Sequence, residues 1–294
     1  MPRFNMASVA GYVRRTVPVG LGLLLGIVIV LTSTHRDTPM WPVWASLAVA
    51  LSIAAGAVFS YGLDRWTELA GPHKLQRSDV ALPVAAIAAL SLVMLLVATL
   101  LTGRSSWRST VLAVTALLGG IPAAGVMYGI RRAARDQAAR AVINGEQVAL
   151  LLTLRQLLQR VLAAVGSLVA LSTLALAAGL KLWRSLPAGS ELGAVTGLPP
   201  EVVPIFGGAG SLLVALLYVP AITALRDCGQ GLCDELFQLD DKVKEGSAIL
   251  SLAENRHQLE QLLGIDRGIF TELQAGLVIL GPLLASAAAT FLSP

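Results

Sequence analysis

Seven long stretches of this 294-residue chain contain no Asp, Glu, Lys, Arg or His, and they constrain its fold more than any other feature. A helix needs roughly 20 apolar residues to cross about 30 Å of bilayer hydrocarbon. The stretches are rich in Leu, Ala and Val and lack the polar/apolar alternation of barrel strands. They predict an all-α integral membrane protein, a seven-transmembrane helical bundle, with spans at Thr16–Thr34, Thr38–Leu63, Val80–Gly103, Ser109–Ile130, Val161–Leu180, Val202–Leu225 and Leu273–Pro294.

Lys and Arg are divided unevenly between the connections on the two sides of these spans. The side that holds the N-terminus has 17 of the 22, and the other side has 5. Because cytoplasmic loops carry an excess of Lys and Arg, we expect the N-terminus in the cytoplasm and the C-terminus outside, in a cell membrane. Two spans have alternatives: the first could be a cleaved signal peptide, and the last could be re-entrant.

The composition agrees with this class. Only 14% of the residues are charged and 55% are hydrophobic, which is too little polar surface for a water-exposed globule. The net charge of +4 follows from the cytoplasmic Lys/Arg excess, and no basic cluster is interleaved with aromatics, so no nucleic-acid partner is expected. The high content of Ala, Leu, Gly and Arg is typical of a GC-rich bacterial genome.

Two cytoplasmic connections are predicted to be helical extensions, between helices 4 and 5 and between helices 6 and 7. In the first, Asn144-Gly145 is a strong turn signal, and an apolar stripe follows it at Leu150, Leu154, Leu157 and Val161. In the second, helix 6 is expected to continue through Cys233, and a helix over Ser247–Leu263 leads back to the membrane. Weak similarities between the two halves leave a duplication open.

The two extensions carry opposite net charge, +4 over 131–160 and −4 over 226–267. We therefore expect them either to pack together, with the basic arm also near anionic headgroups, or to be solvated independently. The side chains proposed for the contact are Arg155, Arg160, Asp240, Asp241 and Glu260.

The predicted organisation has five parts. They are the four-helix transmembrane half 1–130, the basic cytoplasmic hairpin 131–160, transmembrane helices 5 and 6 at 161–225, the acidic cytoplasmic region 226–267, and transmembrane helix 7 at 268–294.

Glycines and prolines interrupt three of the spans. They are Gly119, Gly120 and Pro122 in helix 4, Gly207, Gly208 and Pro220 in helix 6, and Gly281 and Pro282 in helix 7. Unwound segments of this kind bind substrate in transporters, but the same residues also serve kinks and close helix packing. The packing interpretation is favoured, as it is for the small residues Ser52, Gly56 and Ser60 at four-residue spacing.

No catalytic, cofactor or metal site is predicted. Cys228 and Cys233 would point about 140° apart on a helix and are expected to be free thiols. The three His residues lie near no nucleophile motif. A membrane enzyme using Asp234 or Asp240 is a third alternative.

The sequence thus favours a non-catalytic membrane protein whose cytoplasmic helices bind a partner protein, or itself, in an assembly. The alternative is a transporter or channel for a small or lipidic substrate, built on broken helices 4, 6 and 7.

Overall fold

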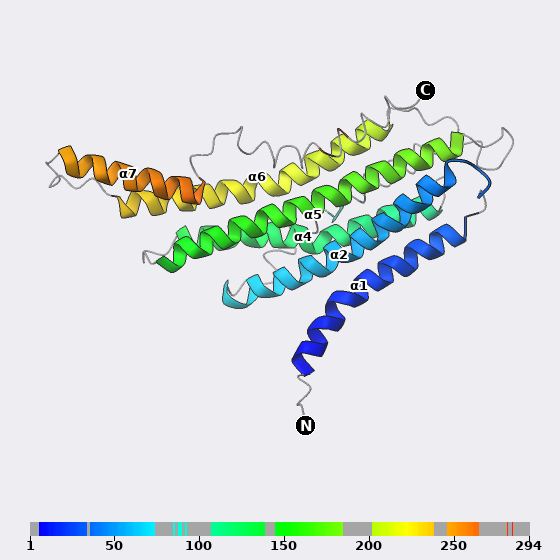
Figure 1. Cartoon of the computed structure of the whole chain (residues 1–294), viewed down its shortest axis with the longest axis horizontal. Helices are drawn as coiled ribbons and strands as arrows, with labels where there is room; N and C mark the ends of the chain where they lie inside the picture. The colour runs from blue at the N-terminus through cyan, green and yellow to red at the C-terminus, as the bar shows by residue number, and fades with distance from the viewer. Residues whose placement is uncertain are drawn as a thin grey trace.

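The computed structural model describes residues 6–33, 36–73, 107–138, 145–184, 202–237 and 246–264, with isolated positions at 85, 88, 89, 92, 281 and 284. Over these residues the chain is helical and contains no strand. The long helices are α1 (Met6–Leu31), α2 (Trp41–His73), α4 (Trp107–Ala138), α5 (Gly145–Arg184), α6 (Val202–Leu236) and α7 (Gly246–Leu263). Figure 1 shows α1, α2, α4, α5 and α6 extending along the long axis, with α7 at one end beside the last turns of α6.

Four of these helices are long and apolar enough to cross a membrane. The qualifying stretches are Trp41–Ala70, Trp107–Ala138, Gly145–Trp183 and Val203–Leu236, and Thr16–Leu31 is a shorter apolar helix. They overlap with the predicted spans 2, 4, 5, 6 and 1, and they contain spans 4 and 5 completely. The predicted spans 3 and 7 lie outside the described residues, apart from the isolated positions. The helical prediction is therefore confirmed for four membrane-length helices.

The helices continue well beyond the charge-free stretches at one end. α4 runs on to Ala138, and α5 begins at Gly145, the second residue of the predicted Asn-Gly turn. α6 runs through Cys233 to Leu236, and α7 starts one residue before the predicted Ser247. The sequence predicted these boundaries because turn and charge signals flank each helix.

Small residues bring α1 and α2 into close antiparallel contact. A Cβ on Gly22 would collide with the carbonyl of Ser52, and one on Gly26 would lie 3.0 Å from the Cα of Val49. In the other direction, a Cβ on Gly56 would collide with the carbonyl of Pro18. The small residues predicted as a packing face of helix 2 therefore contact another helix of the same chain, as small residues do in membrane bundles.

α2 and α4 pack just as closely but run in the same direction. A Cβ on Gly119 would lie 2.8 Å from the Cα of Ala55, and one on Gly62 would lie 2.7 Å from the backbone nitrogen of Ala123. Contact positions thus advance together along both helices, which is the register of a parallel pair.

The predicted apolar stripe of α5 lies in the core. Leu154 and Val161 are at most 1% exposed, as is Leu158 between them, and Leu150 and Leu157 pack against the same cluster. Buried Met127 and Ile130 of α4 belong to that cluster too. The core therefore extends past the charge-free stretch of α5, Val161–Leu180, into the predicted cytoplasmic extension 131–160.

Candidate functional site

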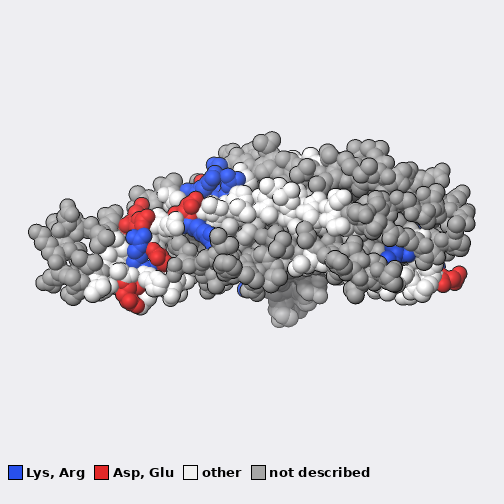
Figure 2. All heavy atoms as spheres, turned by 90° about the horizontal axis from the view of Figure 1, so that it is seen from above, with Lys and Arg blue, Asp and Glu red and all other residues white. Residues whose placement is uncertain are grey.

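Charged side chains gather at the two ends of the bundle. On the face in Figure 2, the described Lys, Arg, Asp and Glu residues form two groups along the long axis, and the described residues between the groups are uncharged. At one end, Arg108 at the start of α4 donates to the carbonyl of Thr32 after α1. At the other, Arg65 pairs with Glu68 and Arg132 lies 3.5 Å from Asp136.

Aromatic side chains accompany these charges. Trp107 lies under Arg108, with 5.5 Å from the guanidinium carbon to the ring centroid, and the Trp41 indole donates to the Ser33 hydroxyl over 3.0 Å. At the opposite end Tyr128 lies 5.9 Å from the guanidinium of Arg131. Trp and Tyr are enriched at both surfaces of a bilayer because their rings are partly apolar and partly polar.

The separation of the two charged ends matches a bilayer. Along α4, Arg108 and Arg131 are 23 residues apart with no charge between them, and at 1.5 Å per residue this is about 34 Å. Bilayer hydrocarbon is about 30 Å thick, so the uncharged part of α4 is long enough to cross it with one guanidinium near each edge. A bilayer placed on this stretch leaves the part of α4 past Arg131 outside the hydrocarbon.

The end of the molecule that extends furthest is the hairpin of α6 and α7. Arg256 of α7 donates from Nη2 to Asp234 of α6 over 2.7 Å, and from Nε to Glu260 over 2.8 Å. The hydrogen bond that Arg256 donates to Glu260 raises the pKa of Arg256 most; desolvation lowers it in part, and the hydrogen bond donated to Asp234 raises it further, so the residue remains a cation. One arginine thus links α7 to α6 and pairs with two carboxylates, so the group of three keeps one net negative charge.

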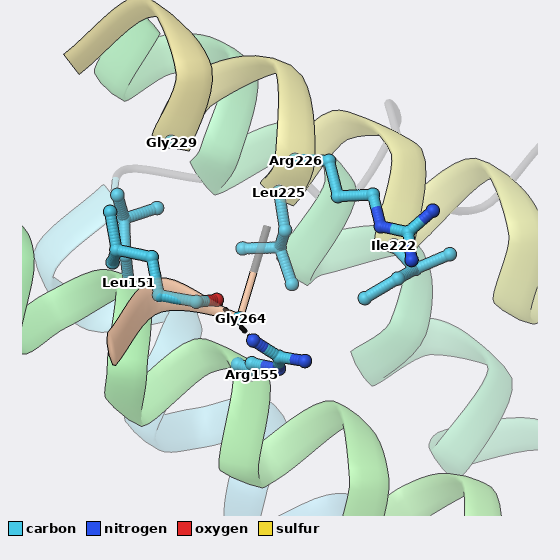
Figure 3. A pocket seen from close by; sticks show the side chains of 8 residues that line it. Leu151, Arg155, Ile222, Leu225, Arg226, Gly229 and Gly264 are labelled. Atoms are coloured by element: carbon cyan, nitrogen blue, oxygen red, sulfur yellow. Dashed lines mark hydrogen bonds between the residues drawn. The ribbon is translucent and has the colours of Figure 1, made fainter. Parts of the chain in front are cut away.

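The far end of α7 is held by α5. Arg155 donates to the backbone carbonyl of Leu263, the last residue of α7, and Figure 3 shows its guanidinium reaching that carbonyl. Gly264 follows with φ of 61°, the left-handed conformation that commonly ends a helix. A Cβ at Gly264 would collide with the Arg155 guanidinium, so only glycine permits this contact.

A small cavity lies beside this contact between Arg155 and Leu263. It measures about 20 Å³, and Leu151, Arg155, Leu225 and Arg226 are among the residues around it. A cavity holds one water once it exceeds about 10–15 Å³. The space suits a single water between the two arginines and is too small for an organic substrate.

The predicted contact residues have different positions. Arg155 reaches α7, but its partner is a backbone carbonyl, whereas Glu260 pairs with Arg256 of its own helix. Arg160 is exposed, and Asp240 and Asp241 lie outside the described residues. The sequence reasoning missed Arg256 and Gly264, although the four-residue spacing of Arg256 and Glu260, and a glycine directly after Leu263, were available signals.

The predicted helix breaks lie in continuous helix. α4 is uninterrupted through Gly119, Gly120 and Pro122, and α6 through Gly207, Gly208 and Pro220. Gly281 is helical, and Pro282 lies outside the described residues. Continuous backbone at these positions of α4 and α6 favours the packing interpretation over unwound substrate-binding segments.

Ligands for a metal are sparse in the part of the chain described. No group of three or more His, Cys, Asp or Glu side chains comes together there. Cys228 and Cys233 are buried free thiols, as predicted, and contribute to the packing of α6. Buried cysteines of this kind behave as small apolar side chains.

The comparisons with other proteins give no relative: the chain matches no known family model, and neither a curated protein nor a solved structure shows significant similarity to it.

Proposed function

We propose that this chain is a seven-span protein of the cell membrane, with its N-terminus in the cytoplasm, and that its cytoplasmic helices bind a partner protein without catalysing a reaction. The observation that carries the proposal is the α6–α7 hairpin. It stands beyond the charged edge of the apolar zone and is held in one geometry by Arg256 and Arg155.

The parallel packing of α2 and α4 supports the count of seven spans. Two helices that run in the same direction require an odd number of crossings between them. One further crossing over the predicted Val80–Gly103 meets that requirement. The same alternation gives opposite directions to α4 and α5 and to α5 and α6, and the six residues between α4 and α5 are a short connection typical of antiparallel neighbours.

The exposed side of α7 supports a partner. α7 contacts α6 and, through its C-terminal end, α5. Its buried side carries Leu263, while Glu254, Gln258 and Gln261 are exposed. Glu235 near the end of α6 is exposed as well. Arg256 offsets only one of the two charges of Asp234 and Glu260, so these further carboxylates give the hairpin an acidic surface suited to a basic segment of a partner.

Charge reversal on this surface tests the proposal. The variant carries Glu235→Lys together with Glu254→Lys, and the matched control is Glu146→Lys, an exposed carboxylate at the start of α5 near the same end. Crosslinking in membranes, followed by gentle solubilisation, should give a partner complex with the unmodified chain and the control, and none with the double variant. A solitary monomer from the unmodified chain, together with solute flux in liposomes, would contradict the proposal.

A further inference from the structure

A cavity of about 170 Å³ lies between α4, α5 and α6. Ala113, Ala116 and Gly120 line it from α4, Val165 and Ser172 from α5, and Leu213 from α6, with others of the same kind. Gly120 is 12 residues from Arg108 and 11 from Arg131, the two charges that bound the apolar part of α4. The cavity is therefore midway between the charged ends.

The described part of the lining offers no free polar group to a ligand. Among the described residues that surround the cavity, none is charged and Ser172 alone has a side-chain hydroxyl. That hydroxyl already donates to the carbonyl of Val169 over 2.7 Å. A water molecule needs two to four polar partners to occupy a cavity, and a polar organic group would lose its hydration without replacement.

The cavity results from small side chains, of which Gly120 is the clearest. A Cβ on Gly120 would have nothing within 4 Å, whereas one on Gly210 across the cavity would collide with the Val169 side chain. Gly210 thus sets the close approach of α6 to α5, and Gly120 leaves space unfilled. Packed interiors seldom leave voids of this size, because the surrounding atoms lose their dispersion contacts.

We propose that this cavity binds the hydrocarbon chain of a bilayer phospholipid. An apolar cavity of about 150 Å³ accepts a benzene molecule, so this one accepts about six chain carbons. The occupant must be apolar throughout that length. At mid-bilayer depth, the apolar groups that surround the protein are the acyl chains of lipids. The inference rests on the proposed membrane location, but not on the proposed partner.

Photolabelling in membranes tests the site. The full-length protein is placed in vesicles of a phosphatidylcholine whose acyl chain carries a diazirine at mid-length, irradiated, and mapped by peptide mass spectrometry. Labels are expected on lining residues such as Leu213. Leu118, which is 53% exposed on the outer side of α4, reports the lipid that surrounds the whole protein.

The decisive variant is Gly120→Leu, whose Cβ meets nothing within 4 Å and whose side chain extends into the cavity. We expect labelling of the lining to fall about tenfold relative to Leu118, since the leucine occupies the volume that the chain needs. The matched control is Gly20→Leu on α1, where a Cβ also has nothing within 4 Å and where labelling of the lining should not change. If Gly120→Leu fails to fold, Ala116→Leu fills the same cavity one turn away.

Two results would overturn the inference. One is labelling of the lining that Gly120→Leu and Ala116→Leu leave unchanged. The other is a lining that is never labelled while Leu118 is labelled, with a higher melting temperature for Gly120→Leu, which indicates an empty cavity. Fractionation of the unmodified protein is read separately, because absence from the membrane fraction would contradict the membrane location itself.

Discussion

Two adjacent glycines of α4 should respond in opposite ways to the same substitution. Gly119 faces α2, where a Cβ would lie 2.8 Å from both the Cα and the carbonyl oxygen of Ala55. Gly120 faces the cavity, where a Cβ meets nothing within 4 Å. The substitutions Gly119→Ala and Gly120→Ala therefore add one identical methyl group to one helix in two different environments.

The magnitude follows from the contact distances. Non-bonded carbon atoms prefer about 3.5–4.0 Å, so the methyl of Gly119→Ala is about 1 Å too close to a backbone that moves only with α2. Overpacking of this kind costs about 1–3 kcal/mol. The gain in helix propensity, about 1 kcal/mol for glycine to alanine, is common to both variants and cancels in the difference between them.

The assay is thermal unfolding of the full-length chain in detergent micelles, followed by circular dichroism. Gly120→Ala should melt above the unmodified protein, and Gly119→Ala should melt below Gly120→Ala. A difference of 1 kcal/mol moves the midpoint by roughly 2–4 °C for a chain of about this size, so the two variants should be separated by about 2–12 °C.

Equal midpoints for the two variants would refute the reasoning, as would a lower midpoint for Gly120→Ala. Either outcome would mean that α4 does not present Gly119 to Ala55. The α2–α4 contact and the position of the cavity would then both be wrong, since they follow from the same rotation of α4 about its axis.

Further predictions concern the hairpin and the topology. Gly264→Ala should speed hydrogen exchange in α7, because its left-handed φ of 61° costs a residue with a Cβ about 1–2 kcal/mol and the methyl meets Arg155, whereas Gly231→Ala, in open space on α6, should not. Arg256→Gln should also speed exchange in α7, and its difference from the unmodified protein should shrink in 1 M salt, where the screening length is about 3 Å. Reporter fusions after Arg160 and after Arg184 should lie on opposite faces of the membrane, and the same compartment for both would contradict the span over Val161–Leu180.

Local signals in the sequence were sufficient for most helix boundaries. The Asn144-Gly145 turn predicts the start of α5, and the change from charged to uncharged residues predicts the membrane-length part of each described span. The apolar stripe through Leu154 and Val161 also predicts the buried face of α5, because a repeat of three and four residues keeps one side of a helix in contact with its neighbours. Each of these features depends on residues close in sequence.

Contacts between distant segments could not be predicted in the same way. The Arg155 contact joins α5 to the last carbonyl of α7, more than 100 residues away, and a backbone carbonyl has no signature in a sequence. Charge counting suggested carboxylates as the partners of the basic arm. In the structure, Glu260 and Asp234 already pair with Arg256. The basic region 131–160 instead contacts α7 at the C-terminal end of that helix, through Arg155.

The rotation of each helix about its own axis could not be predicted from the sequence either. Successive residues of an α-helix are turned by 100°, so Gly119 and Gly120 look in clearly different directions although nothing in their neighbourhood distinguishes them. Which glycine packs and which opens a cavity depends on how α4 meets α2, α5 and α6 together. A pattern of glycines therefore indicated close packing in general, and only the arrangement of helices assigns it to particular residues.

Charge and length distinguish the same end of the bundle. The end that holds 17 of the 22 Lys and Arg residues in the predicted topology is the end at which α4 continues to Ala138, α6 to Leu236, and α7 is added. At the opposite end α1 stops at Leu31 and α4 begins at Trp107, next to Arg108. A net Lys/Arg excess directs a segment to the cytoplasm during insertion, whereas helix length past the bilayer provides surface for a partner. The two properties share a source, because the extensions 131–160 and 226–267 hold 11 of these 17 Lys and Arg residues. The segments that orient the chain in the proposed topology are therefore also those that provide the proposed binding surface.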